Sequence, residues 1–336
     1  EIKPMKMTIE PAAYNPNDET IQWACNYLTS HGYELKTKVI EIVQDTPWSC
    51  VIRFATSEGL IYLKKTPEQL ALEATIIQTL RDQFHASVPA VIAYNAELNC
   101  FLMKDSGKSL RSVLKKNFDE ALLCKAIDQF TSLQIGVSDH IAVFFDLGVP
   151  DWRLDKFPEL YQQLLSQKDV LMADGLSETE LGELEKLTPT VAALCKKLSG
   201  YSIKPTLVQP DFNDNNTLID SVSQKITIID LGEISISHPF FSLLNCLYVI
   251  KKHHALTDED VRYLQIRDAC LKNYMNFESK KRLLEALEVA LLLFPIYGVF
   301  AGYRMVFACE QSKFTGPFQR HARPGLLLRE FINPHK

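Results

Sequence analysis

The sequence lacks the cysteine spacings that metal and redox chemistry use. Its 336 residues include eight cysteines, but no two of them form a C-x-x-C pair, which argues against a zinc ribbon or a redox motif. The chain is also too long for a small scaffold held together by disulfides. Several cysteines lie in apolar segments, where a free thiol usually serves as a small core residue. We therefore expect reduced thiols and a cytoplasmic protein.

The sequence also lacks a strong excess of charge and a long apolar run. There are 36 Lys and Arg against 41 Asp and Glu, a net charge of −5, which gives no electrostatic reason to expect a nucleic-acid or membrane partner. The longest apolar run covers residues 289–303 and is interrupted by Pro295 and Gly298, whereas a membrane-spanning helix needs about 20 residues. We expect a soluble protein, and the sequence leaves its oligomeric state open.

Several motifs for nucleotide, ester or metal chemistry are missing. The sequence contains no G-x-G-x-x-G, G-x-S-x-G or H-E-x-x-H segment. Gly107-Lys108-Ser109 suggests a P-loop, but the first glycine of that motif would fall on Leu102. His253 and His254 are adjacent, so on a helix they point in different directions, and we expect a solvated helix end there, not a metal site.

The first hundred residues contain short β-branched runs between two helical segments. A helix is predicted over 18–32, followed by strands over 38–43, 50–55 and 60–64. The turns between these strands are too short for a parallel crossover, so the strands form an antiparallel meander. The next helix is predicted to begin with Thr66 as its N-cap, Pro67 in its first position and Gln69 completing a capping box. Two more strand-like runs, SVPAVIAY and CFLMK, follow it.

Beyond residue 105 helical patterns dominate. Helices are predicted over 119–134, 156–167, 178–199 and from 239 to about 310, interrupted by one β-hairpin within 206–232. We therefore predict an α+β fold of two lobes. Residues 1–104 form a small antiparallel β lobe with a leading helix, and residues 105–336 form a larger helical lobe that carries the hairpin.

The hairpin contains the residues best suited to catalysis. Asp211 is followed five residues later by Asn216, and Asp230 ends the apolar run ITII. Transfer of a γ-phosphoryl group needs a carboxylate for the attacking hydroxyl and oxygen ligands for Mg²⁺. A loop with Asp and Asn five apart can present both groups, and an Asp on the paired strand faces the same point. The Asp-x4-Asn spacing alone is a weak signal for phosphoryl transfer. Combined with a later Asp-x-Gly at the end of a strand, it is a much stronger one.

At these residues the sequence resembles the aminoglycoside-phosphotransferase-like small-molecule kinases, which have a two-lobe protein-kinase-like fold. The catalytic loop of that family has the approximate form H-G-D-x-x-x-x-N and is followed by I-D-[WF]-[GE]. The resemblance extends to residues 46–73, which look like the phosphate-covering turn, the lysine strand and the next helix. It extends also to the hinge-like segment 100–107 and to the segment ISHPFFSL, and covers roughly residues 38–308.

The resemblance implies an ATP-dependent kinase, with GTP possible as donor, that uses Mg²⁺ and phosphorylates a hydroxyl of a small molecule such as an aminoglycoside, amino alcohol or sugar. By this resemblance Asp211 is the catalytic Asp, Asn216 and Asp230 are metal ligands, and Lys64 pairs with the α- and β-phosphates. Glu73 is the best candidate for the partner of Lys64. An independent argument supports that pair, because an unpaired carboxylate on the apolar face of a helix is costly. The alternative is that Glu73 is solvated at the edge of the lobe.

Two further contacts with the nucleotide are expected from the resemblance. Ser49 closes the turn between the first two strands, where its backbone N–H and hydroxyl are placed to cap a phosphate. The alternative is a plain β-turn with Trp48 as core packing. Residues 101–104 are expected to line the adenine, with backbone hydrogen bonds from Met103 and Lys104. Met103 as a core side chain is the alternative.

The sequence departs from the family pattern beside the catalytic Asp. Gln209-Pro210 stands where the family has His-Gly, and Leu231 replaces the usual aromatic residue. Gln can donate and accept hydrogen bonds, so it can brace the loop as the histidine does, while Pro210 stiffens the turn. The departure motivates an alternative from another class, a pseudokinase that serves as a nucleotide-binding or interaction module with little turnover. A protein kinase is a weaker reading, since there is no A-P-E segment after Asp230.

Overall fold

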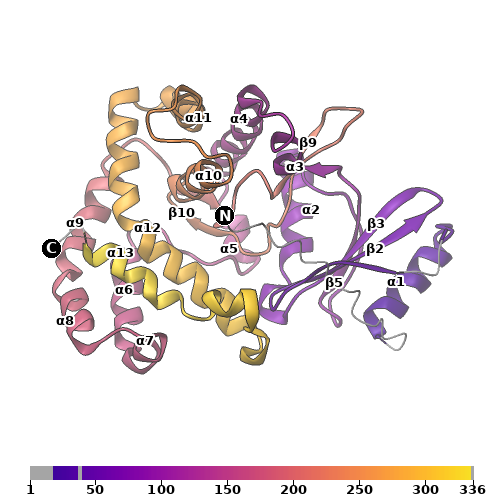
Figure 1. Ribbon diagram of the computed structural model, residues 1–336, viewed down its shortest axis with the longest axis horizontal. Coiled ribbons are helices and arrows are strands. Elements are labelled where there is room, and N and C mark those ends of the chain that lie inside the picture. Colours follow the sequence, from indigo (N-terminus) through magenta and orange to yellow (C-terminus); the bar gives the residue numbers. More distant parts are fainter. Residues whose placement is uncertain (1–17, 37–39, 334–336) are drawn as a thin grey trace, which may run out of the picture.

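The protein folds into a small β-rich lobe and a larger helical lobe, as the computed structural model shows (Figure 1). The structure describes residues 18–36 and 40–333. The two-lobe α+β fold predicted from the sequence is confirmed. The first residues of the predicted strand 38–43 lie outside the described residues.

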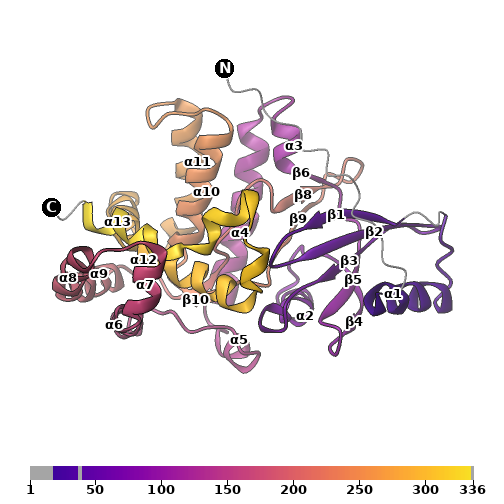
Figure 2. The same cartoon turned by 60° about the horizontal axis from the view of Figure 1, so that its bottom comes forward.

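The small lobe is built on one antiparallel sheet of five strands. Its strand order is β1-β2-β3-β5-β4, and its strands are β1 (Glu41–Asp45), β2 (Cys50–Thr56), β3 (Gly59–Lys65), β4 (Val91–Asn95) and β5 (Cys100–Lys104). Helix α1 (Glu19–Ser30) covers the outer face of the sheet, away from the helical lobe (Figures 1 and 2). Asp18 caps this helix by accepting a hydrogen bond from Thr20 N, as an N-cap Asp does.

The alternation of side chains along β3 and β5 determines which residues face the helical lobe. Ile61 and Leu63 pack with residues of α1 in one hydrophobic cluster, so the residues between and after them, Tyr62 and Lys64, face the other way. Lys64 pairs with Phe101 across the two strands. The face opposite α1 is therefore the one that meets the helical lobe.

Helix α2 begins later than the sequence predicts. Residues Glu68–Leu70 form a short 3₁₀ turn, and α2 runs over Glu73–Phe84 with no side-chain cap. The predicted capping box at Thr66 is therefore wrong. The chain turns away between the two segments, which buries Leu70 and places Glu73 in the first turn of α2. The position of Glu73 on a buried face was predicted correctly, although its place in the helix was not.

The chain crosses between the lobes immediately after β5. Strand β6 (Lys108–Ser109) no longer belongs to the five-stranded sheet, because it pairs with β8 (Thr217–Ile219) of the helical lobe. Gly107 in this connection has φ of +106°, and a Cβ there would lie 2.2 Å from the carbonyl oxygen of Ile219. Only glycine fits at this crossing.

The helical lobe surrounds two small antiparallel sheets. Strand β8 also pairs with β9 (Ile226–Ile228), and β7 (Thr206–Val208) pairs with β10 (Ser235–Ser237). The predicted helix 178–199 is divided in two at Leu187, with Pro189 in the first turn of the second part, where its missing N–H is tolerated. The helices of the lobe are α3 (Leu110–Leu114), α4 (Glu120–Val137), α5 (Ala142–Asp146), α6 (Phe157–Ser166), α7 (Lys168–Asp174), α8 (Glu178–Lys186), α9 (Thr188–Ser199), α10 (Phe240–His253), α11 (Val261–Lys272), α12 (Lys280–Ala308) and α13 (Leu328–Ile332), with further 3₁₀ turns at Asn273–Asn276, Gln311–Lys313, Gly316–Ala322 and Pro324–Leu327.

Helix α12 lies within the segment predicted as helical and runs without a break through Pro295 and Gly298. Within the described residues it has the length and composition to cross a membrane, with a mean hydropathy of 1.9 over its most apolar window. However, 56% of that window is buried inside the protein, and α12 contacts α9, α10 and α13. These contacts are those of a central core helix of the large lobe.

Candidate active site

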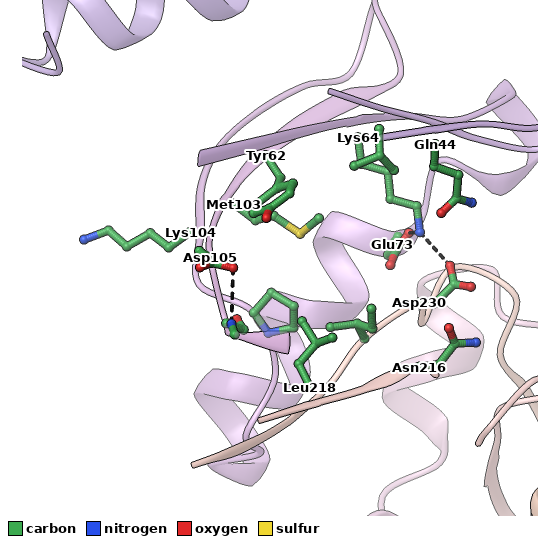
Figure 3. A pocket seen from close by; sticks show the side chains of 15 residues that line it. Gln44, Tyr62, Lys64, Glu73, Met103, Lys104, Asp105, Asn216, Leu218 and Asp230 are labelled. Carbon is green, nitrogen blue, oxygen red and sulfur yellow. Dashed lines mark hydrogen bonds and ion pairs between the residues drawn. The ribbon is translucent and has the colours of Figure 1, made fainter. Parts of the chain in front are cut away.

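A cavity of about 200 Å³ lies between the two lobes. Its walls come from both sides of the cleft, so it exists only because the lobes meet there (Figure 3). The β-sheet supplies its upper wall and the β8–β9 region its lower wall. The lining residues are Gln44, Val51, Tyr62, Lys64, Glu73, Pro89, Met103, Lys104, Asp105, Ser106, Gly107, Asn216, Leu218, Ile229 and Asp230.

The predicted pair of Lys64 and Glu73 is present in this cavity. Lys64 Nζ lies 2.6 Å from Glu73 Oε2, and both side chains are buried, with exposures of 8% and 3%. Burial lowers the pKa of Lys64, but the carboxylates of Asp230 and Glu73 outweigh it and raise that pKa. Burial raises the pKa of Glu73, while Lys64 and the N–H of Leu231, which donates to Oε1 at 3.1 Å, stabilise its ionised form. The geometry is that of a buried ion pair, so Glu73 is not solvated.

Asp230 reaches the same ammonium group from the opposite lobe. Lys64 Nζ donates to Asp230 Oδ1 at 2.6 Å (Figure 3). Asp230 has φ of +64°, a left-handed conformation that a non-glycine residue keeps only when its surroundings hold it. Gln209 provides part of that support, because its Nε2 donates to the carbonyl oxygens of Ile229 at 2.8 Å and Asp230 at 3.0 Å. Gln209 therefore braces the loop, as its hydrogen-bonding capacity predicts.

Asp211 lies across the cleft from this ion pair, in the loop between β7 and β8. Its Oδ1 accepts a hydrogen bond from Asn213 Nδ2 and its Oδ2 one from Asn216 Nδ2, both at 2.8 Å. Asn245 Nδ2 of α10 lies 3.4 Å from Oδ1. Solvent reaches Asp211 through the cleft, yet the surrounding protein desolvates the carboxylate, and Asp230 repels its charge. These two effects raise the pKa of Asp211 to about 6, a range suited to a general base near neutral pH.

The residues predicted as metal ligands fit a magnesium ion. Asn216 Nδ2 donates to Asp211, whereas the oxygen of its amide accepts no hydrogen bond from the described residues and points toward Asp230 (Figure 3). Asp230 uses only one carboxylate oxygen for Lys64. An amide oxygen and a carboxylate oxygen are hard ligands of the kind Mg²⁺ takes together with phosphates and waters. Among the described residues no group of three or more His, Cys, Asp or Glu side chains could hold a metal.

The structure does not bring Ser49 into the cavity. The N–H of Ser49 donates to Thr46 Oγ1 at 2.9 Å, and its hydroxyl accepts from Gln44 Nε2 at 3.1 Å. Trp48 packs on the rings of Phe318 and His321 from the C-terminal part of the chain, at centroid distances of 5.5 and 5.3 Å. The groups expected to cap a phosphate are therefore used inside the turn, and the plain β-turn alternative is the better description. Gln44, which the sequence did not indicate, lines the cavity instead.

In the hinge segment after β5, the backbone groups that face the cavity are not all those expected from the sequence. Met103 lines the cavity and also packs against the larger hydrophobic core, which includes residues of both lobes. The backbone N–H of Lys104 donates to Ala90 O at 3.0 Å, so it is used within the small lobe, and its side chain points away from the cavity (Figure 3). Asp105 N likewise donates to Leu60 O at 3.1 Å. The backbone amide of Ser106, which lines the cavity, makes no hydrogen bond within the described part of the chain.

Two residues outside the motifs complete the loop after Asp230. Arg304 of α12 donates from Nη1 to the carbonyl oxygen of Ile234 at 2.7 Å and anchors that loop. Glu233 lies partly exposed near Asp230 and Asp211. Burial, followed by the charges of these two carboxylates, raises the pKa of Glu233 to about 8. No pattern in the sequence indicates Arg304, since its partner is a backbone group 70 residues away.

A buried ionic cluster lies behind the Asp211 loop and was missed completely. His254 was expected at a solvated helix end, but its side chain is only 4% exposed, and Nε2 lies 2.7 Å from Asp214 Oδ2. Arg111 donates to the other oxygen of Asp214 through Nε at 3.0 Å and Nη2 at 2.8 Å. The expectation failed because residues 111, 214 and 254 are distant in sequence and meet only when α3 and α10 pack around the loop.

The sequence matches no protein-family model and no curated protein, but its fold matches solved structures over almost their full length. Aminoglycoside 2'-phosphotransferase-IIIa in complex with GDP has a TM-score of 0.60 and 15% identity, with 95% of this chain and 100% of that chain covered. Ethanolamine kinase of Plasmodium vivax has a TM-score of 0.60 and 12% identity, with coverage of 94% and 91%. ADP-bound aminoglycoside phosphotransferase APH(2'')-Ib has a TM-score of 0.58 and 14% identity, with coverage of 94% and 98%.

These matches define the class of fold. The chain has the protein-kinase-like fold of small-molecule phosphotransferases, and the resemblance drawn from its motifs is confirmed at the level of the fold. At 12–15% identity a shared fold does not carry an activity with it, so the activity of this chain rests on its own residues.

Proposed function

We propose that this protein is a kinase that transfers the γ-phosphoryl group of ATP to a hydroxyl group of a small molecule. The observation that carries the proposal is the convergence of Asp211, Asn216, Asp230 and the Lys64–Glu73 pair on one cleft. These are the groups that phosphoryl transfer needs for positioning and charge stabilisation. They come from β3, α2 and two loops of the other lobe, so chance alone does not explain their meeting.

The chain's own residues divide the work in the following way. Lys64, held by Glu73, pairs with the α- and β-phosphates of the nucleotide. Asp211 orients the acceptor hydroxyl and takes its proton while the oxygen attacks the phosphorus atom, a contribution of roughly 10²–10⁴ in rate. Asn216 and Asp230 hold Mg²⁺ through oxygen atoms. The metal, when bound, neutralises charge on the transferring phosphates.

The nucleotide is proposed to lie in the interlobe cavity with its base between Tyr62, Met103 and the hinge amide of Ser106. Among the proteins with this fold, one is a GDP complex and another is bound to ADP. ATP is the phosphoryl donor we propose. Titrating the protein with ATP and with GTP in separate experiments tests which of the two nucleotides it binds. A thermal-shift titration measures either, because a ligand selective for the folded state raises its melting temperature.

The acceptor is proposed to be an amino alcohol, an aminoglycoside or a sugar. The proteins of this fold include an ethanolamine kinase and aminoglycoside phosphotransferases. The competing function is a pseudokinase, which the replacement of the family histidine by Gln209 suggests. Against it stands Asp211, which is kept in place by hydrogen bonds from Asn213 and Asn216, since a nucleotide-binding chain without turnover has no need of a positioned proton acceptor.

The test is an ATP-consumption screen of aminoglycosides, amino alcohols, amino-acid alcohols and sugars with Mg²⁺ present. We expect a nucleotide-dependent thermal shift together with acceptor-dependent ADP release for one of these classes. A thermal shift with no ADP release for any acceptor would favour the pseudokinase. No thermal shift with either nucleotide would refute the nucleotide site itself.

A further inference from the structure

The buried cluster behind the catalytic loop has no role in the function proposed above. Asp214 is completely buried, and both of its carboxylate oxygens are used: Oδ1 by Arg111 and Oδ2 by His254. A buried carboxylate is costly unless charged and hydrogen-bonding partners surround it. Stability alone does not explain such a cluster, because a well-packed apolar set of similar volume is often as stable.

The cluster is connected to Asp211 through a single amide group. Arg111 Nη2 donates to Asn213 Oδ1 at 2.9 Å, and the backbone N–H of Asn215 donates to the same oxygen at 2.8 Å. With its oxygen fixed in this way, Asn213 must turn its Nδ2 group toward Asp211, where it donates to the carbonyl oxygen and to Oδ1, each at 2.8 Å. The orientation of the Asp211 carboxylate therefore depends on Arg111.

The two outer members hold the loop from two different elements. Arg111 is the second residue of α3, which follows β6 at once, and its backbone N–H donates to Asp214 O at 2.9 Å. His254 is the C-cap residue of α10 and packs on the ring of Phe118 at a centroid distance of 5.0 Å. The loop is thus held between the connection of the lobes and the end of α10.

We propose that Arg111, Asp214 and His254 are positioning residues that hold the Asp211 carboxylate in its reactive orientation through Asn213. The proposal rests on the phosphotransferase function proposed above. It predicts that loosening the cluster slows phosphoryl transfer while nucleotide binding measured without Mg²⁺, which uses Lys64 and the hinge and not Asn216 of the loop, is unaffected. Groups that orient a reacting residue from behind typically change activity by about 10–100-fold when they are lost.

Variants of the two adjacent histidines test the proposal, with His254 as the residue tested and His253 as its control. His254→Phe removes the donor to Asp214 but keeps an aromatic ring against Phe118, so folding is preserved better than with Ala. His254→Gln restores an N–H donor to the same pocket. His253→Ala is the control, because His253 is exposed and makes no hydrogen bond within the described part of the chain. Acceptor-dependent kcat, the nucleotide dissociation constant without Mg²⁺ and amide hydrogen exchange over 211–216 are measured for all three.

We expect His254→Phe to lower kcat by about 10–100-fold, with an unchanged nucleotide dissociation constant and faster exchange in the loop. His254→Gln should recover most of the loss, and His253→Ala should behave as the wild type. An unchanged kcat and unchanged loop exchange in folded His254→Phe would overturn the proposal. So would a loss of nucleotide affinity in parallel with kcat, because that pattern indicates general loosening of the structure.

Failure of the proposed function gives a different result. If the wild type transfers no phosphoryl group to any acceptor, kcat cannot be compared between the variants. Hydrogen exchange over 211–216 still tests whether the cluster holds the loop. Faster exchange in His254→Phe and not in His253→Ala would then support the positioning role without any turnover. Equal exchange in both variants would refute it.

Discussion

The side chain of Lys64 has two carboxylate partners, and this changes what its removal should do. Glu73 is 3% exposed, so Lys64→Ala leaves a buried charge without its ammonium partner, which is expected to cost about 3–5 kcal/mol of the free energy of unfolding. Glu73→Ala is expected to cost less, because Lys64 retains Asp230 at 2.6 Å. In a double-mutant cycle by urea unfolding, the double variant should be far less destabilised than the sum of the singles. Additive losses would show that the pair is not coupled.

Gly107 is a residue at which the addition of a single Cβ atom is expected to destabilise the fold. An alanine Cβ would lie 2.2 Å from the backbone oxygen of Ile219, and a backbone atom of a paired strand cannot move aside cheaply, so Gly107→Ala should destabilise by roughly 3 kcal/mol. Gly59→Ala is the control, since Gly59 has nearly the same φ, +105°, with no atom within 4 Å of the added Cβ. It should cost only the conformational strain, about 1–2 kcal/mol. Equal losses of melting temperature would contradict the steric argument.

Gln209 tests whether the departure from the family histidine matters. Its two hydrogen bonds to Ile229 and Asp230 already brace the loop, so Gln209→His should change kcat by less than about tenfold. Gln209→Leu removes both donors at a similar side-chain size and should weaken Mg²⁺-dependent nucleotide binding, because the left-handed backbone of Asp230 loses its support. A large rise in kcat in Gln209→His would instead show that Gln209 limits catalysis in the natural chain, and would favour the pseudokinase.

Helix α8 is fixed at its N-terminus by a capping box that also holds the last helix of the chain. Glu180 accepts from Ser177 N at 2.8 Å, as a capping-box residue does, and from Arg329 Nε at 2.7 Å. The hydrogen bond from Arg329 and that from Ser177 N lower the pKa of Glu180 to about 2. The ionised form therefore stabilises the fold above the ordinary pKa of Glu, and this contribution is lost as the pH falls toward 2.

Glu180→Gln should lower the free energy of unfolding by roughly 1 kcal/mol at pH 7, the upper range for a partly exposed pair. The difference from the wild type should stay constant from pH 7 down to about 5 and shrink between there and pH 2, because the unfolded chain binds the proton of Glu180 at a higher pH than the folded one does. Urea unfolding at several pH values measures this, with Glu178→Gln in the same helix turn as the control. A difference that stays constant with pH would rule out an electrostatic contribution from Glu180.

Most strands and helices follow from local patterns, and the failures have identifiable causes. The strands of the small lobe and helix α1 were predicted within a few residues because alternation, turns and capping are local signals. The start of α2 was misplaced because burial of Leu70 outweighed a good capping sequence. The division between α8 and α9 was missed although Pro189 marks it.

In the molecule as a whole, the two lobes bring together residues that are far apart in the chain. The motif residues Lys64, Asp211, Asn216 and Asp230 were predictable because a known family carries the same pattern. Glu73 was predictable from the cost of an unpaired buried carboxylate. Gln44, Ser106, Arg304 and the Arg111–Asp214–His254 cluster were not, because each acts through a backbone group or a distant side chain and has no fixed spacing from the motif.

The central claim is that this cleft transfers a phosphoryl group with Asp211 as the proton acceptor. The most direct test is the rate of phosphoryl transfer from Mg-ATP to the acceptor found by the screen, measured for the wild type and for Asp211→Asn with nucleotide affinity in parallel. The Asn variant keeps the size of the side chain and loses its charge, so we expect kcat to fall by about 10²–10⁴ while the nucleotide dissociation constant changes little. Transfer at the wild-type rate by Asp211→Asn would contradict the account.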